Sequence, residues 1–258
     1  MIEVVDISKS FDGKQILKNV SARFETGKTN LIIGQSGSGK TVLMKSVVGL
    51  LRPDRGQILY DGRDTLKMDA KQIKALRQEI GMLFQGSALF DSETVLGNVM
   101  FPLVMFGEMS RAEMKERAMF CIERVNLVGA ENKYPSEISG GMQKRVAIAR
   151  AIALNPKYLF CDEPNSGLDP KTSIVIDELL SDITHEYNIT TVINTHDMNS
   201  VLGIGENIVF LNKGHREWVG DKKKIFTTAN EALNEFVFAT RLFQEVKDHI
   251  VASARPMD

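Results

Sequence analysis

A glycine-rich loop between an apolar strand and an apolar helix restricts the fold of this chain more than any other feature of its sequence. The segment reads IIGQSGSGKTVL over residues 32–43. Glycine costs backbone entropy, so Gly34, Gly37 and Gly39, three glycines within six positions, need a structural reason. They would let successive N–H groups turn inward and bind an anion. The helix that begins near Gly39 would add the positive end of its dipole.

Lys40 and Thr41 extend the loop to Gly-x-x-x-x-Gly-Lys-Thr, the pattern of a phosphate-binding P-loop. The context fits, because KTNLII reads as a strand before the loop and TVLMKSVVGLL as a helix after it. Lys40 would neutralise charge on phosphate oxygens, and Thr41 would offer its hydroxyl to Mg²⁺. The strand–loop–helix context disfavours the alternative, a turn that binds nothing. The candidate phosphate-binding residues are Gly34, Gln35, Ser36, Gly37, Ser38, Gly39, Lys40 and Thr41.

The composition excludes several classes of protein. A hydrophobic content of 43% in 258 residues allows a sizeable core. The net charge of −1 argues against a nucleic-acid partner. Cys121 and Cys161 lie in apolar runs, which predicts buried thiols in a reducing compartment, and their spacing resembles no zinc site. No run approaches ~20 apolar residues, so no membrane-spanning helix is expected.

Alternating strand and helix patterns predict an α/β fold with a largely parallel sheet. IEVVDIS and VSARF predict antiparallel strands near the start, and the pattern from Gln85 to about Asn155 is mainly helical. Within that stretch, Ser110 and Glu113 form a capping box. KYLFCDEP and TTVINTHD predict further strands, and NIVFLNKGHREWVG predicts a hairpin that turns at residues 212–214. We therefore expect a helical segment inserted between strands of one sheet.

Two acidic residues follow the buried strand YLFC. The strand would deliver Asp162 and Glu163 to the carboxyl end of the sheet, where such folds bind their ligands. Asp162 suits the Mg²⁺ shell, so Glu163 is free to polarise a water for in-line attack. A pair of ordinary surface acids is the alternative, and the nearby P-loop disfavours it.

The segment ISGGMQKRVAIARAIAL contains a second candidate anion site. Ser139, Gly140 and Gly141 come directly before a helix with an apolar face, so its N-terminus could also bind phosphate. One nucleotide does not need two such sites from one chain. Two chains arranged head to tail would use both, each closing over the nucleotide of the other.

With these motifs in this order, about residues 1–225 resemble the ATP-binding subunits of ABC transporters. The family signature Leu-Ser-Gly-Gly-Gln reads Ile-Ser-Gly-Gly-Met here, so Met142 departs from it while Ser139 and both glycines are kept. The resemblance implies Mg²⁺-dependent ATP hydrolysis by a homodimer of such subunits. It also implies separate integral-membrane permease subunits as partners.

The resemblance assigns further roles to single residues. Phe11, where family members often carry tyrosine, would stack on adenine. Gln85 would join Mg²⁺ to the helical subdomain, and Asp169 lies in the loop that would cross the dimer interface. His196 in NTHD would contact the γ-phosphate. The expected catalytic residues are Glu163, His196 and Gln85, and the expected Mg²⁺ ligands are Thr41, Gln85 and Asp162.

Within the family, QGSALFDSETVLGNVMFPL at residues 85–103, together with Met142, resembles the ATPase subunits of Mla/Mce-type bacterial phospholipid transporters. That likeness implies phospholipid transport between membranes and accessory lipid-transport subunits. It also implies a peripheral position on the cytoplasmic face of the bacterial inner membrane. An importer of amino acids or other small solutes is the alternative, and a soluble ABC-type ATPase switch without a membrane partner is a second one.

The resemblance also implies a domain organisation. A P-loop NTPase domain over residues 1–225 would contain a RecA-like parallel sheet, an N-terminal antiparallel β subdomain and an inserted helical subdomain at about 86–155. Residues 226–258 are expected to form a helical tail. Apolar residues recur there at the spacing of one amphipathic helix: Leu233, Phe236, Phe243, Val246 and Ile250. This helix would dock on its own domain or, as the Mla-type likeness implies, pack against the second ATPase subunit.

Overall fold

A six-stranded sheet forms the core of the chain, whose residues 1–253 are described by a computed structural model. The strand order is β10-β9-β3-β8-β7-β6, and every neighbouring pair is parallel except β9 and β10. The strands are β3 (Thr29–Ile33), β6 (Ile80–Leu83), β7 (Tyr158–Asp162), β8 (Thr190–Asn194), β9 (Asn207–Asn212) and β10 (His215–Gly220). This arrangement confirms the predicted parallel α/β core, including the hairpin that turns after Asn212.

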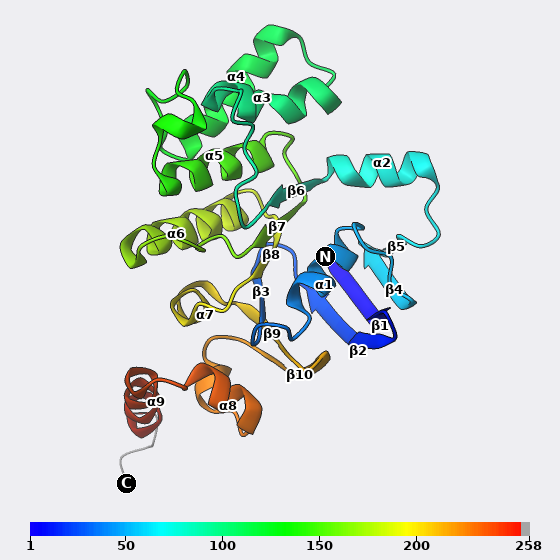
Figure 1. Ribbon diagram of the computed structural model, residues 1–258, viewed down its shortest axis with the longest axis vertical. Coiled ribbons are helices and arrows are strands. Elements are labelled where there is room, and N and C mark those ends of the chain that lie inside the picture. Colours follow the sequence, from blue (N-terminus) through cyan, green and yellow to red (C-terminus); the bar gives the residue numbers. More distant parts are fainter. Residues whose placement is uncertain (254–258) are drawn as a thin grey trace.

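A second, antiparallel sheet lies beside the first (Figure 1). Its order is β2-β1-β4-β5, with β1 (Ile2–Phe11), β2 (Lys14–Phe24), β4 (Arg55–Tyr60) and β5 (Arg63–Asp64). One hydrophobic cluster joins Val20 of β2, Leu43 of α1 (Lys40–Val47) and Ile32 of β3. The helix that follows the P-loop therefore packs against both sheets, which confirms the predicted N-terminal antiparallel part.

The predicted helical insert lies between β6 and β7 and projects from one end of the parallel sheet (Figure 1). It contains α3 (Val95–Phe106), α4 (Arg111–Arg124), a 3₁₀ turn (Pro135–Glu137) and α5 (Gly140–Ile152). The capping box of α4 is present, because Ser110 N donates to Glu113 Oε2 at 2.7 Å and Glu113 N to Ser110 Oγ at 3.4 Å. Both cysteines are buried, as predicted.

Three further helices contact the parallel sheet, α2 (Ala70–Gln78) at its edge strand β6, and α6 (Pro170–Glu186) and α7 (Met198–Ile204) at β3. A 3₁₀ turn (Lys224–Phe226) lies further along the chain. Across residues 1–253, no helix combines the length and the apolar character needed to cross a lipid bilayer.

The C-terminal segment forms two helices, so the prediction of a single amphipathic helix is wrong. α8 (Glu231–Val237) is followed by its C-cap, Phe238, whose φ of −103° and ψ of 34° leave the helical region, and α9 (Arg241–Ser253) comes next. The chain bends there because the Phe238 ring is buried against Phe226, with ring centroids 5.7 Å apart. Thr240 then accepts the first backbone hydrogen bond of α9, from Gln244 N at 3.1 Å.

The two C-terminal helices differ in how deeply they pack. Leu233 and Val237 of α8 are buried in the hydrophobic cluster of the parallel sheet. Phe236 stacks on Phe210 of β9, with ring centroids 5.5 Å apart. In α9, by contrast, Leu242 remains 66% exposed. The apolar stripe of α8 is thus used within its own chain.

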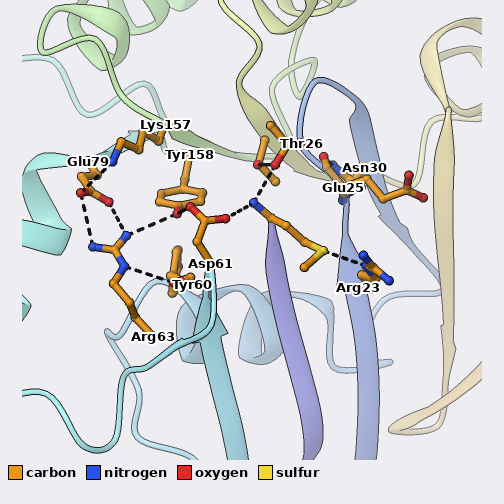
Figure 2. Close-up of polar contacts among 12 residues, drawn as sticks. Arg23, Glu25, Thr26, Asn30, Tyr60, Asp61, Arg63, Glu79, Lys157 and Tyr158 are labelled. Atoms are coloured by element: carbon orange, nitrogen blue, oxygen red, sulfur yellow. Dashed lines mark hydrogen bonds and ion pairs between the residues drawn. The ribbon is translucent and has the colours of Figure 1, made fainter.

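A polar network fastens the two sheets together near the start of β7 (Figure 2). Arg63 Nη2 donates to Glu79 Oε2 at 2.5 Å, and the Tyr158 hydroxyl donates to Asp61 Oδ2 at 2.5 Å. The ring of Tyr158 also meets Tyr60 edge to face, with centroids 4.7 Å apart. Residues from the antiparallel sheet, the end of α2 and the parallel sheet therefore hold one another, which fixes the orientation of the antiparallel sheet.

Candidate active site

The P-loop leaves β3 and enters α1 through a backbone that requires glycine. Gly34 and Gly39 have φ values of +149° and +107°, in the region that side chains rarely adopt. A Cβ at Gly34 would overlap the backbone oxygen of Leu211, and one at Gly39 would lie 2.9 Å from Leu17 Cδ2. The loop can therefore keep this shape only with glycine at both positions.

Lys40 lies inside the P-loop and is only 7% exposed. Its Nζ donates to the backbone oxygens of Gly34 at 2.8 Å and Gln35 at 3.2 Å. Burial lowers the pKa of Lys40, and the nearby carboxylates of Glu163 and Asp162 oppose that shift. Ser38 Oγ is buried and has no partner in the described chain. A buried hydroxyl and a buried ammonium facing one glycine loop fit the phosphate groups of a nucleotide.

A groove of about 830 Å³ runs along the P-loop, a volume in the usual range for a small-molecule site. At one wall, the exposed ring of Phe11 at the end of β1 is available for stacking. Phe236 of α8, which sequence reasoning did not place here, also lines the groove. The lining residues are Phe11, Lys14, Ile16, Gln35, Ser36, Gly37, Gly39, Lys40, Thr41, Val42, Glu163, His196 and Phe236.

Glu163 contacts both of the other predicted catalytic residues, Gln85 and His196. Its Oε2 accepts a hydrogen bond from Gln85 Nε2 at 3.1 Å, and its Oε1 lies 3.0 Å from His196 Nδ1. Glu163 follows β7 directly and has a φ of +47°, a strained conformation for a residue with a side chain. Such strain persists where the surroundings hold the residue in place, and both oxygens of this carboxylate are held.

Asp162 and Thr41, the predicted Mg²⁺ ligands, both lie near the P-loop lysine: Thr41 follows Lys40 in the chain, and Asp162 is close enough to act on its pKa. Asp162 ends β7, and its Oδ1 accepts a hydrogen bond from Asn194 Nδ2 of β8 at 3.0 Å. Residues 1–253 contain no group of three or more His, Cys, Asp or Glu side chains that could together hold a metal ion. Mg²⁺ beside nucleotide phosphates commonly uses one or two protein oxygens, so the hydroxyl of Thr41 and the carboxylate of Asp162 suit it. Gln85 turns its amide nitrogen to Glu163, and its amide oxygen is the atom that could bind a metal.

Ser139, Gly140 and Gly141 lie apart from the groove. Ser139 is the N-cap of α5, where its Oγ accepts a hydrogen bond from Met142 N at 3.3 Å, and both glycines belong to the first turn. Within the described chain, none of the three is among the residues that line the P-loop groove. That two chains use both half-sites head to tail stays a prediction.

Asp169 also lies outside the groove lining. It caps α6, because Thr172 N donates to its Oδ1 at 3.0 Å and Thr172 Oγ1 to its Oδ2 at 2.5 Å. These hydrogen bonds lower the pKa of the Asp169 carboxyl group. In this chain, Asp169 fixes the end of the loop that runs from Glu163 to α6.

A buried polar cluster supports that same loop. Asn165 Nδ2 donates to Asp177 Oδ1 of α6 at 2.9 Å and to Ser200 Oγ of α7 at 3.0 Å. Asp177 is only 6% exposed. Burial raises its pKa to about 6, although hydrogen bonds from Ser200 and Asn165 act in the opposite direction. Sequence reasoning missed this cluster, because a lone Asp in a helix carries no pattern.

We expect Asp177→Asn to stabilise the chain at pH 8 but not at pH 4. The pKa of Asp177 rises from its usual 3.8 to about 6 on folding, so the folded state binds more protons between these values. The stability of the wild type therefore falls as pH rises through that window, by up to about 3 kcal/mol. Urea unfolding of both chains at several pH values measures the difference. A difference that does not change with pH would contradict the assignment.

Comparisons with known proteins show what the chain is similar to. A family model described as ABC transporter matches residues 17–166. The probable ribonucleotide transport ATP-binding protein mkl of Mycobacterium leprae (strain TN) is 37% identical over 241 residues, which cover 93% of this chain and 70% of the relative. The methionine import ATP-binding protein MetN of Carboxydothermus hydrogenoformans is 38% identical over 258 residues, 99% of this chain and 76% of the relative.

A solved structure also resembles this chain along most of its length. A dimeric ATP-binding cassette in a post-hydrolysis state, bound to ADP and Pi, matches with a TM-score of 0.78 and 34% identity. The match covers 86% of this chain and 99% of that chain. The likeness therefore extends over most of the fold and is not confined to the P-loop.

Proposed function

The chain belongs to the ABC transporter family, and from that membership we propose that it is the ATP-hydrolysing subunit of an importer of small solutes. The observation that carries the ATPase activity is the convergence of Lys40, Glu163 and His196 on one groove. The importer class is supported by relatives named for methionine import and ribonucleotide transport. We therefore propose import of small solutes, in place of phospholipid transport, as the leading function of the chain.

Different residues at the groove bind the nucleotide and activate the attacking water. The backbone of the P-loop and Lys40 bind the phosphates of ATP, and Phe11 stacks on the adenine. Mg²⁺, when bound, neutralises charge on the phosphate oxygens, and Thr41 and Asp162 would hold it. Glu163 accepts a proton from the attacking water, with its carboxylate oriented by Gln85 and His196.

The complete site is proposed to form between two copies of the chain. Ser139, Gly140 and Gly141 of one copy would close over the nucleotide bound by the P-loop of the other, and Asp169 would lie at the contact. The dimeric state of the ADP-bound neighbour supports this arrangement. We keep residues 1–225 as the proposed ATPase domain, with a helical subdomain at about 86–155 and a tail at 226–258.

A membrane permease is the proposed partner, which would place the chain on the cytoplasmic face of a bacterial inner membrane. Phe90 and Phe101 are exposed on the helical insert, with ring centroids 4.6 Å apart. Both lie in residues 85–103, which we propose as the contact with the permease. Exposed aromatic side chains that pack on one another suit a helix of a partner protein.

Phospholipid transport remains the second candidate. It rests on the sequence of residues 85–103 and on Met142, which resemble the Mla/Mce-type ATPases. Accessory lipid-transport subunits would then be further partners. A soluble ATPase switch without a membrane partner is the third.

Purification of the tagged chain from detergent-solubilised membranes separates these candidates. We expect a permease to co-purify, and ATP hydrolysis by the complex to rise when methionine or a ribonucleotide and its binding protein are added. Co-purified phospholipid together with hydrolysis that does not respond to small solutes would favour the lipid transporter. Recovery of the chain alone, with full ATPase activity, would favour the soluble switch.

A further inference from the structure

Two cationic side chains of α5 hold the backbone of the loop that begins at Gln85. Lys144 Nζ donates to the backbone oxygen of Gln85. Arg150 donates to the backbone oxygens of Ser87 at 2.7 Å and Ala88 at 2.8 Å. Three carbonyl groups of one short loop are therefore bound by one helix.

The loop has a shape that needs this support. Ser87 and Ala88 have φ values of +61° and +49°, in the left-handed region. Residues with a side chain occupy that region only where the surroundings over-determine the conformation. The hydrogen bonds from Lys144 and Arg150 hold the loop in this conformation at both of its ends.

Lys144 is the more unusual of the two cations. It is only 4% exposed, and burial lowers its pKa, while the nearby Cys161 and Glu163 oppose the shift. A buried ammonium is costly unless it is hydrogen-bonded or paired. Within residues 1–253, Lys144 forms no ion pair with a carboxylate, and its Nζ donates to the backbone oxygen of Gln85. Burying this ammonium costs free energy, and its hydrogen bond goes to the backbone oxygen of Gln85. This contact points to a role for Lys144 at Gln85.

We propose that Lys144 is a positioning residue for ATP hydrolysis. By holding the main chain of Gln85 against α5, it keeps Gln85 Nε2 on the carboxylate of Glu163, 3.1 Å away. Because Ser139 is the N-cap of α5, a displacement of this helix at the second half-site would be passed to Gln85 of the same chain. The inference rests on the proposed ATPase function and adds to it a link between the two half-sites that one chain carries.

Lys144→Met removes the ammonium and keeps the volume of the side chain. We expect kcat for ATP to fall about 10–100-fold with KM little changed, since a small misplacement of a positioning group costs rate more than binding. We also expect faster amide hydrogen exchange across residues 85–88. Lys144→Arg retains a cationic donor and should restore both properties in large part.

Arg145→Met is the matched control, because it removes a neighbouring cation of α5 that holds a different segment. Arg145 Nη1 donates to Asn126 O at 2.9 Å, away from the Gln85 loop. We expect this variant to keep the exchange rate of residues 85–88 and the kcat of the wild type. An equal effect of both Met variants would mean general damage to α5 and would overturn the proposal.

A second variant and the exchange measurement keep the inference testable if Lys144→Met does not fold or if the wild type does not hydrolyse ATP. If Lys144→Met does not fold, Lys144→Gln, which keeps an amide donor, replaces it. A kcat and an exchange rate that are both retained or both altered would support the proposal, whereas a change in only one of them would overturn it. If the wild type does not hydrolyse ATP, the proposed function fails, and the exchange rates still test whether Lys144 holds the loop. Wild-type kcat in a folded Lys144→Met chain that does hydrolyse ATP would overturn the inference alone.

Discussion

Glu163→Gln is expected to lower ATP turnover by about 10²–10⁴-fold, the usual cost of losing a general base. Glutamine has nearly the same shape, so the contacts with Gln85 and His196 have partners of similar size. The amide cannot accept a proton from water at neutral pH, whereas the groups that bind phosphate are untouched. We therefore expect the variant to bind Mg-ATP and to accumulate as a closed dimer.

Single-turnover hydrolysis and size-exclusion chromatography with ATP measure the two effects of that change. Glu178→Gln is the matched control, because Glu178 is an exposed carboxylate of α6. It should hydrolyse ATP at the wild-type rate. Parental turnover by Glu163→Gln in the assembled transporter would show that another group is the base.

Lys40→Ala is expected to lower kcat by about 10²–10³-fold, the cost of removing one preorganised donor that stabilises transition-state charge. It should also weaken ATP binding, because Lys40 is the full positive charge enclosed by the P-loop. Lys45→Ala, at an exposed position of the same helix, is the control and should change neither quantity. Isothermal titration with ATP, alongside steady-state kinetics, separates binding from chemistry.

A mixed dimer tests whether Lys40 and Ser139 serve the same nucleotide from different chains. Pairing Lys40→Ala with Ser139→Arg should leave one intact site and one doubly altered site. Its turnover should then clearly exceed that of either variant as a homodimer. Two equally impaired sites in the mixed dimer would show that both motifs act within one chain.

The part of the site that consists of short motifs at strand ends could be predicted from the sequence. Asp162 ends a buried strand, Glu163 and His196 follow buried strands, and parallel strands bring their carboxyl ends to one edge. Their mutual distances therefore follow from topology once the strands are recognised. The P-loop could be predicted for the same reason, because its glycines and Lys40 act through local backbone geometry.

The parts that sequence reasoning missed depend on tertiary packing. Asn194 and Lys144 reach their partners across strands or from a helix, and a single polar residue in an apolar run has no periodicity to reveal its partner. The bend at Phe238 was missed because helical spacing continues through it, whereas the burial of its ring against Phe226 decides the conformation. Phe236 lines the groove because α8 docks on the parallel sheet, where its ring stacks on Phe210.

The position of β3 in the sheet has a consequence for how the chain is made. The strand that carries the P-loop is hydrogen-bonded to β8 on one side and β9 on the other, so both neighbours are encoded far downstream in the chain. At ordinary synthesis rates, this apolar strand emerges from the ribosome on the order of ten seconds before its partners exist. Such non-local pairing folds slowly and leaves two open edges in the meantime. Protection of the nascent segment, by a chaperone or by early packing of α1 on the antiparallel sheet, therefore becomes part of producing an active subunit.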